Sequence, residues 1–335
     1  MDFSDIKKKY SWVGFSFFLF GLTMEGAAVL LRILLRNVDD RILDNSWVVF
    51  ILGLAPIWAI GFPICLLAAS RVPSVKPEDH QIKPKYLLQF YMMLVFLMMT
   101  ANIAGTIFIF IIEHVTGLTI ENATIDMIQK QEFLPSLIFT VILGPILEEL
   151  AYRKLLIDKL GQYNKRYAII LSGVMFGLFH TNLHQFFYAT IIGFLFAYIY
   201  TISGRVRYTM ILHMTFNFIH GILPMAIVKN LDLDSLSSIS ESDVMNPEVQ
   251  KQVLELYTNP AFLGLLGYGL LMIGVWVAGL VLWIINHKKI KVDDSHSPLP
   301  IKEGKYIPFI NVGMILFAVL TIAITVLEII LLNIK

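Results

Sequence analysis

Three charged residues interrupt an apolar run in the middle of the chain. The run extends from residue 133 to residue 156 and contains Glu148, Glu149 and Arg153. A charged side chain at the centre of a membrane helix costs roughly 2.5–3.5 kcal/mol on insertion scales, so such residues face a bundle interior or a water-filled cavity. We therefore take these three residues as the start of a functional site.

The spacing of the three charges separates their roles. Residues four positions apart share a helix face, so Glu149 and Arg153 can form an ion pair, with the acid N-terminal to the base as such pairs prefer. Glu148 points about 100° away from Glu149 and lacks this partner, which leaves its carboxylate free to act as a general base. The alternative is a structural role, in which all three charges form one buried network that fixes helix packing.

Two other apolar segments carry histidine and asparagine side chains. One group surrounds a junction between segments and the other lies within a later segment: His180, Asn182 and His184, then His213, Asn217 and His220. His213 and Asn217 share a helix face, and donors with this spacing could hold a developing oxyanion. His180 and His184 have the spacing of a two-histidine metal face, but a turn predicted at Asn182 would interrupt that helix.

The composition indicates a helical membrane protein. Of 335 residues, 57% are hydrophobic and 15% are charged, and the mean hydropathy of +0.71 lies outside the soluble globular range. The net charge of +1 gives no reason to expect a nucleic-acid partner. Since about 20 apolar residues cross a bilayer, we predict an all-α polytopic bundle of about nine transmembrane helices. They occupy residues 11–35, 47–70, 86–112, 133–157, 167–181, 184–203, 208–228, 261–286 and 307–334. The single cysteine, Cys65, is predicted to be a small buried residue.

Basic residues gather in alternate loops, which predicts the orientation of the chain. Cytoplasmic loops retain Lys and Arg, and 18 of the 26 basic residues lie in 1–10, 71–85, 158–166 with Lys154, 204–207 and 287–306. We predict a multi-pass protein of the cytoplasmic membrane with its N-terminus inside and its C-terminus outside. Three regions follow: N-terminal helices at 1–130, core helices at 131–228, and an acidic outer loop with the C-terminal helices at 229–335.

The polar residues of the core helices form three short motifs in order. They are Glu148-Glu149-x-x-x-Arg153, Phe176-x-x-x-His180 and His213-x-x-x-Asn217. Together they resemble the motifs of the CAAX-protease and bacteriocin-processing (Abi, or CPBP) family of intramembrane proteases. The resemblance covers about 135–220, roughly a quarter of the chain. It implies a helical bundle around a central intramembrane cavity and endopeptidase activity on a peptide or a lipid-modified or membrane-associated protein.

The resemblance also implies roles for the motif residues. Glu148 and His180 would activate the attacking water, His213 and Asn217 would stabilise the tetrahedral oxyanion, and Glu149 and Arg153 would brace the site. In eukaryotes the family's substrate is a prenylated C-terminus. Bacterial relatives are linked to peptide maturation, bacteriocin self-protection and cell-envelope phenotypes. The partners expected are therefore a peptide or membrane-protein substrate and the lipid bilayer.

The need for a metal stays open at the level of the sequence. Glu148, His180 and His213 could make a zinc site with an open position, or a glutamate could activate water without Zn²⁺. The His-Glu-x-x-His pattern of zincins is absent. Two other functions compete with proteolysis. One is a non-catalytic scaffold or bacteriocin immunity factor of the same fold. The other is a transporter with the carboxylates as a proton relay, although no inverted repeat is visible.

One geometric difficulty concerns His180. At a rise of about 1.5 Å per residue, Glu148 and His213 are expected in the cytoplasmic half of the membrane. His180 follows Tyr167, the predicted start of its helix, by thirteen residues, or about 20 Å, and is therefore expected nearer the outer side. Either the hairpin formed by 167–181 and 184–203 turns within the membrane against the cavity, or its first helix starts deeper on the cytoplasmic side. A separation above about 10 Å between His180 and Glu148 would contradict their grouping, because a general base must reach its water.

Overall fold

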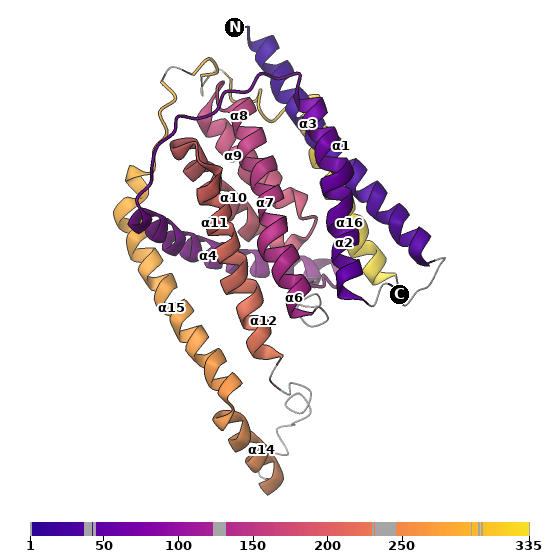
Figure 1. Ribbon diagram of the computed structural model, residues 1–335, viewed down its shortest axis with the longest axis vertical. Coiled ribbons are helices and arrows are strands. Elements are labelled where there is room, and N and C mark those ends of the chain that lie inside the picture. Colours follow the sequence, from indigo (N-terminus) through magenta and orange to yellow (C-terminus); the bar gives the residue numbers. More distant parts are fainter. Residues whose placement is uncertain are drawn as a thin grey trace.

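The computed structural model describes residues 2–36, 42, 45–122, 132–229, 231, 246–295, 297–300, 302 and 304–334. All regular elements within these residues are helices. Eight of the helical stretches are long and apolar enough to cross a membrane: Phe3–Leu35, Ser46–Ala69, Pro84–Thr116, Phe133–Leu160, Leu183–Ser203, Val206–Val228, Pro260–Lys289 and Val312–Asn333. Each corresponds to one predicted span, so the predicted all-α polytopic bundle is confirmed (Figure 1).

Several of the spans are built from more than one helical piece. The N-terminal helices are α1 (Phe3–Arg36), α2 (Ser46–Pro56), the π-helical turn η2 (Ile57–Gly61), α3 (Phe62–Ala69) and α4 (Pro84–Thr116). The fourth span contains α6 (Phe133–Ser136), the π-helical turn η3 (Leu137–Leu143), α7 (Gly144–Glu149), the π-helical turn η4 (Leu150–Leu155) and α8 (Leu156–Leu160). They are followed by α9 (Lys165–Phe179), α10 (Leu183–Ser203), α11 (Val206–Asn217), the π-helical turn η5 (Phe218–Ile222) and α12 (Leu223–Val228). The C-terminal part has α14 (Pro247–Thr258), α15 (Pro260–Asn286), the short 3₁₀ turn η7 (His287–Lys289) and α16 (Val312–Asn333).

The predicted span at 167–181 is not among the eight helical stretches that are long enough to cross a membrane. It corresponds to α9, whose 15 residues extend about 22 Å, less than the roughly 30 Å of a hydrocarbon core. The helix ends because Thr181 takes a left-handed conformation with φ 48° and Asn182 caps α10 by accepting the backbone N–H of Gln185. Of the two alternatives for this hairpin, the short α9 favours a turn within the membrane.

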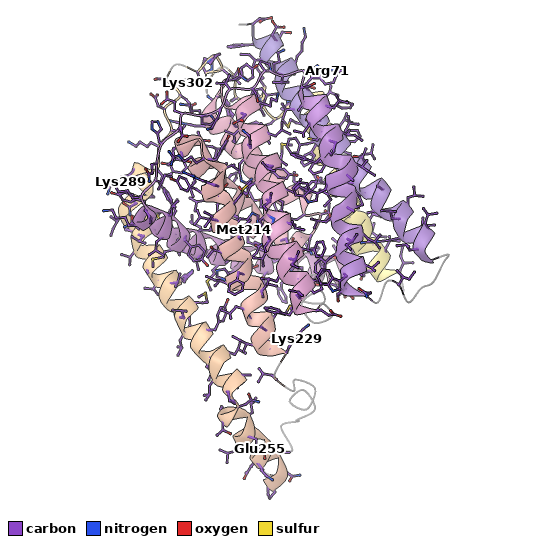
Figure 2. All side chains as sticks on the ribbon, in the orientation of Figure 1. Arg71, Met214, Lys229, Glu255, Lys289 and Lys302 are labelled. Carbon is purple, nitrogen blue, oxygen red and sulfur yellow. The ribbon has the colours of Figure 1, made fainter. Side chains whose placement is uncertain are left out.

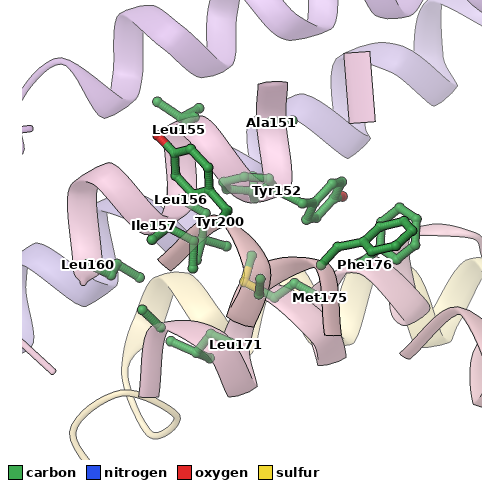
Figure 3. Close-up of a cluster of buried hydrophobic side chains, with 14 of the residues drawn as sticks. Ala151, Tyr152, Leu155, Leu156, Ile157, Leu160, Leu171, Met175, Phe176 and Tyr200 are labelled. Carbon is green, nitrogen blue, oxygen red and sulfur yellow. The ribbon is translucent and has the colours of Figure 1, made fainter. Parts of the chain in front are cut away.

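Glycines allow α9 and α10 to pack closely as an antiparallel pair. A Cβ at Gly193 would lie 2.6 Å from the Cα of Gly173, and a Cβ at Gly177 would lie 2.8 Å from the carbonyl oxygen of Phe186. Beside this pair, apolar side chains of η4, α8, α9 and α10 form a buried cluster that includes Leu156, Met175 and Tyr200 (Figure 3). This packing holds the fourth span against the hairpin.

The segments predicted to be cytoplasmic meet at one end of the bundle. Backbone N–H groups of Val75, His80 and Leu299 donate to the carbonyls of Asp158, Ser203 and Tyr163, respectively. Arg71 and Lys302 lie at this end, whereas Lys229 and Glu255 lie toward the opposite end (Figure 2). The alternation of loops is therefore present, while the assignment of this end to the cytoplasm stays a prediction.

Two further predictions can be compared with the fold. Cys65 is fully buried, as predicted. The division into regions at 130 and 228 stays a prediction, because nothing in the arrangement of helices tests it. Most of the predicted acidic outer loop, residues 230 and 232–245, lies outside the described residues.

Candidate active site

The two glutamates occupy a short α-helical piece between two π-helical turns. They end α7, with η3 before it and η4 after it. Pro145 in α7 helps to explain the first irregularity, because proline has no N–H to donate. The N–H of Gly144 bonds to the carbonyl of Phe139, so the carbonyl of Thr140 receives no donor from either Gly144 or Pro145. Such π-helical turns are frequent at functional sites.

Asn217 supplies the donor that Thr140 lacks. Its side-chain Nδ2 donates to the Thr140 carbonyl oxygen over 2.8 Å. Buried carbonyl groups are normally hydrogen-bonded. The Asn217 amide on α11 therefore supplies the hydrogen bond that the Thr140 carbonyl loses at the π-helical turn. This bond fixes the orientation of the Asn217 amide. The second N–H of the amide makes no hydrogen bond that is described for this residue.

The predicted ion pair within the fourth span is present. Nε of Arg153 lies 3.1 Å from Oε2 of Glu149, and both side chains are fully buried. Arg153 also donates to the hydroxyl of Ser172, and its guanidinium carbon lies 4.5 Å from the centroid of the Phe176 ring. The arginine therefore ties the fourth span to α9 through a hydrogen bond and a cation–π contact.

His213 lies between the two glutamates. Its Nδ1 atom is 3.0 Å from Oε1 of Glu149, and its Nε2 atom is 3.5 Å from Oε2 of Glu148. Because Glu149 is paired with Arg153 and accepts hydrogen bonds, Nδ1 carries the proton that it donates. Nε2 is then the nitrogen available to Glu148 and to a substrate. The sequence predicted Arg153 as the partner of Glu149 but missed His213 as its second partner.

His180 is held in the same manner by a backbone carbonyl. Its Nδ1 lies 2.8 Å from the carbonyl oxygen of Phe176, which can only accept, so Nδ1 donates and Nε2 is left free. The Phe176 ring makes edge-to-face contacts with the rings of His180 and His213, at centroid separations of 4.8 and 5.8 Å. One aromatic side chain thus positions both histidines.

A cavity of about 730 Å³ joins the predicted residues. Glu148, His180, His213 and Asn217 all line it, although they come from three separate spans. The Glu148 side chain is 29% exposed, whereas Glu149 is fully buried. Glu148 is therefore the carboxylate that a water molecule or a substrate can reach. His180, which helix rise placed toward the other side of the membrane, lines the same cavity as Glu148.

The need for a metal stays a prediction. No group of three or more His, Cys, Asp or Glu side chains in the described part of the chain could hold a metal ion. Zinc requires its ligands at roughly 2.0–2.3 Å from one point. Nε2 of His213 and Oε2 of Glu148 lie 3.5 Å apart, but with His180 they make no such group of three. The two-histidine face is also not formed, because Nε2 of His184 lies 3.0 Å from the carbonyl oxygen of Ile120.

Several residues of the cavity wall have no role predicted from the sequence. His220 lines the cavity, and its Nε2 lies 3.2 Å from the hydroxyl of Tyr91 on α4. The signal for His220 was available, since it follows Asn217 by three residues. Four methionines form part of the apolar wall: Met98, Met99, Met225 and Met272. Their flexible thioethers make this wall adaptable in shape.

Comparisons with known proteins agree with the motifs. Residues 130–219 match the family model described as type II CAAX prenyl endopeptidase Rce1-like. A relative from Bacillus subtilis (strain 168), named "Putative membrane peptidase YdiL", is 32% identical over 109 residues, which make up 32% of this chain and 44% of the relative. The chain therefore aligns with less than half of that relative's length. No solved structure matches the chain. Residues 130–219, which contain all three motifs, are therefore similar to the CAAX-protease family of membrane peptidases.

Proposed function

We propose that the chain is an intramembrane endopeptidase in which Glu148 is the general base. The observation that carries this proposal is the contrast between the two neighbouring carboxylates. Glu149 is fully buried and pairs with Arg153, whereas Glu148 lines the cavity and, among the described residues, its one ion-pairing contact is with Nε2 of His213 at 3.5 Å. A general base must contact the water that it activates, and the cavity position of Glu148 allows this contact.

The proposed reaction begins with a water molecule between Glu148 and the free Nε2 of His180. Glu148 removes a proton from the water as its oxygen attacks the carbonyl carbon of the scissile peptide bond. The proton can pass to Nε2 of His213, which then donates to the oxyanion together with the second N–H of Asn217. When the intermediate collapses, the C–N bond breaks and the leaving amine takes the proton.

The supporting residues keep these groups in their reactive states. Glu149 accepts from Nδ1 of His213 and Phe176 accepts from Nδ1 of His180, so the Nε2 atoms of both rings are left for chemistry. No step in this scheme uses a metal. A supporting arrangement of this kind orients catalytic groups in advance of the reaction, which is where much of an enzyme's rate enhancement arises.

The substrate that we propose is a membrane-associated or lipid-modified protein segment, as in CAAX-type proteases. The support is the cavity itself, which combines the polar motif residues with a methionine-rich apolar wall. Such a wall can accommodate apolar groups of different shapes. A role in bacteriocin processing would use the same site on a different peptide.

A comparison of Glu148→Gln with the native chain tests the function. Both are expressed in the same host membrane, and the membrane and secreted peptides are compared by mass spectrometry. Cleavage products should be absent from the variant, while the amount and thermal stability of the protein stay normal. Glu255→Gln, which changes an exposed glutamate on α14, is the matched control and should cleave normally. Equal cleavage by Glu148→Gln would reject the proposed role.

Separate replacements of the three motif residues distinguish catalysis from a scaffold role. A scaffold of this fold would keep its full biological effect when Glu148, His180 and His213 are each replaced. The proposed protease would lose the effect with each replacement that leaves the protein folded.

A further inference from the structure

An apolar groove lies on the outside of the bundle, away from the candidate active site. It has a volume of about 800 Å³ and runs between α4, α9, α10 and α15. We call it the lipid groove, and its lining residues are Leu97, Arg166, Ile169, Ile170, Ile191, Phe194, Leu195, Tyr198, Trp283, Ile290, Lys291 and Val292. None of the motif residues belongs to it.

One end of the groove carries positive charge. Lys291 lies at this end, and Lys83 and Lys289 line an adjoining pocket of about 380 Å³ that shares Tyr198 and Ile290 with the groove. Among the ion pairs found in the described residues, none includes these three lysines. Arg166 differs from them, because it pairs with Asp294.

The position of the charged end matches that of a membrane surface. It belongs to the end of the bundle where the basic loops meet, and Trp283 and Tyr198 lie beside it. Trp and Tyr side chains concentrate at the level of lipid headgroups. Basic pockets between transmembrane helices on the cytoplasmic side bind anionic headgroups. Lys289 donates to the side-chain oxygen of Asn286, so the groove combines an apolar channel, an aromatic rim and cations that have no acidic partner among the described residues.

We propose that this groove binds an anionic phospholipid of the bilayer. One acyl chain lies among the isoleucine, leucine and phenylalanine side chains of the groove. The phosphate of the headgroup contacts Lys289 and Lys291, with Lys83 in the adjoining pocket. Charge complementarity selects this occupant, since a zwitterionic headgroup would bring a second positive charge to the lysines.

The test measures lipid binding by the purified full chain. Phosphatidylglycerol and phosphatidylcholine with identical brominated acyl chains are added in detergent, and quenching of tryptophan fluorescence is followed. The difference between the native chain and Trp283→Phe isolates the signal from the groove. The native chain should bind phosphatidylglycerol more tightly than phosphatidylcholine.

Two sets of lysine variants separate this site from general surface charge. The preference of Lys289→Gln/Lys291→Gln for phosphatidylglycerol should fall by about fivefold for each lysine removed. Lys302→Gln/Lys305→Gln removes the same charge from the same end of the bundle outside the groove, and it should keep the preference. Both pairs are at exposed positions, and equal melting temperatures without lipid would establish that each variant is folded.

A third variant tests the apolar part of the groove. Ile170→Trp should fill it and reduce quenching by both lipids. The proposal is overturned if the native chain binds both lipids equally, if both lysine pairs have the same effect, or if Ile170→Trp binds normally. Displacement of the lipid by an equal concentration of a soluble oligoglutamate peptide would also overturn it, and would point to an acidic protein segment instead.

Discussion

His213 and Glu149 are joined by a buried contact of 3.0 Å between Nδ1 and Oε1. This contact gives the two ring nitrogens different roles, one in holding the ring and one in the proposed chemistry. Nδ1 is occupied by Glu149, while Nε2 is the atom that lies 3.5 Å from Glu148. Glu149 is thus more than a counter-ion for Arg153, because it also fixes which nitrogen of His213 meets the cavity.

Two substitutions at His213 can separate these sides. The amide of asparagine reaches about as far as Nδ1, and the longer glutamine reaches about as far as Nε2. His213→Asn should keep the bond to Glu149 and nearly normal thermal stability, yet lower the cleavage rate by roughly 10²–10³-fold, as loss of one oxyanion donor does. His213→Gln should lose the bond to Glu149 and melt at a lower temperature. Cleavage by His213→Asn at the native rate would contradict the role assigned to Nε2.

The buried ion pair makes a separate prediction about stability. Arg153 and Glu149 are both fully buried, and removal of one partner of such a pair costs about 3–5 kcal/mol. Arg153→Met should therefore melt well below the native chain. Glu149→Leu/Arg153→Met should regain much of that loss, because paired charges can be replaced by apolar side chains of similar volume.

Activity should not follow stability in this pair of variants. The double variant lacks the acceptor for Nδ1 of His213, so its cleavage rate should stay low although its melting temperature recovers. Recovery of both quantities together would mean that Glu149 acts through protein stability alone.

The sequence predicted the parts of the site that depend on local spacing. The Glu149–Arg153 pair follows from positions four residues apart. His213 and Asn217 are also four residues apart, and both line the cavity as their shared helix face predicted. The contact between His213 and Glu149 could not be predicted in this manner, because it joins α11 to the fourth span across 64 residues. Such a contact depends on how the helices pack, which spacing along one helix does not determine.

The π-helical turns of the fourth span also could not be predicted from the sequence. Apolar periodicity predicted one continuous helix at 133–157, yet η3 and η4 interrupt it. Pro145 lies at the start of α7, and the donor for the freed Thr140 carbonyl is Asn217, which lies 77 residues away. The end of α9 was predicted more closely, because the sequence indicated a 15-residue segment at 167–181 and a turn at Asn182, and α9 has 15 residues. Thr181 and Asn182 end that helix through backbone conformation and capping, although the apolar composition continues on both sides.

Close packing of the hairpin predicts that Gly177 is sensitive to a single added methyl group. A Cβ there would meet the side chain of Thr190 and the carbonyl oxygen of Phe186 on α10. Gly177→Ala should cost about 1–3 kcal/mol, as overpacking does, and should lower activity because His180 lies three residues further along.

A glycine on α15 provides the control for this substitution. Apart from its chain neighbours and the adjacent backbone of α15, nothing lies within 4 Å of a Cβ built at Gly267, so Gly267→Ala should melt at or above the native temperature and keep its activity. Equal melting temperatures for Gly177→Ala and the native chain would mean that α9 and α10 can separate at little cost.

The arrangement of the candidate ligands predicts that cleavage does not depend on a metal. In the described residues, Glu148, His180 and His213 belong to no group suited to hold an ion. Cleavage should therefore continue after prolonged incubation with a chelator, and elemental analysis of the active protein should find less than one zinc per chain. Loss of activity that returns when Zn²⁺ is added would contradict this prediction and would mean that the site rearranges around the ion.

The predicted orientation can be tested because the native cysteine is inaccessible. Cys65 is fully buried, so a membrane-impermeant maleimide should label the native chain weakly. Lys76 lies in an exposed position of the linker between α3 and α4, and Thr116 lies exposed at the far end of α4. With the N-terminus inside, intact cells should label Thr116→Cys but not Lys76→Cys, and permeabilised cells should label both. The reverse pattern in intact cells would invert the bundle, and the basic loops that meet around the lipid groove would then face the outside.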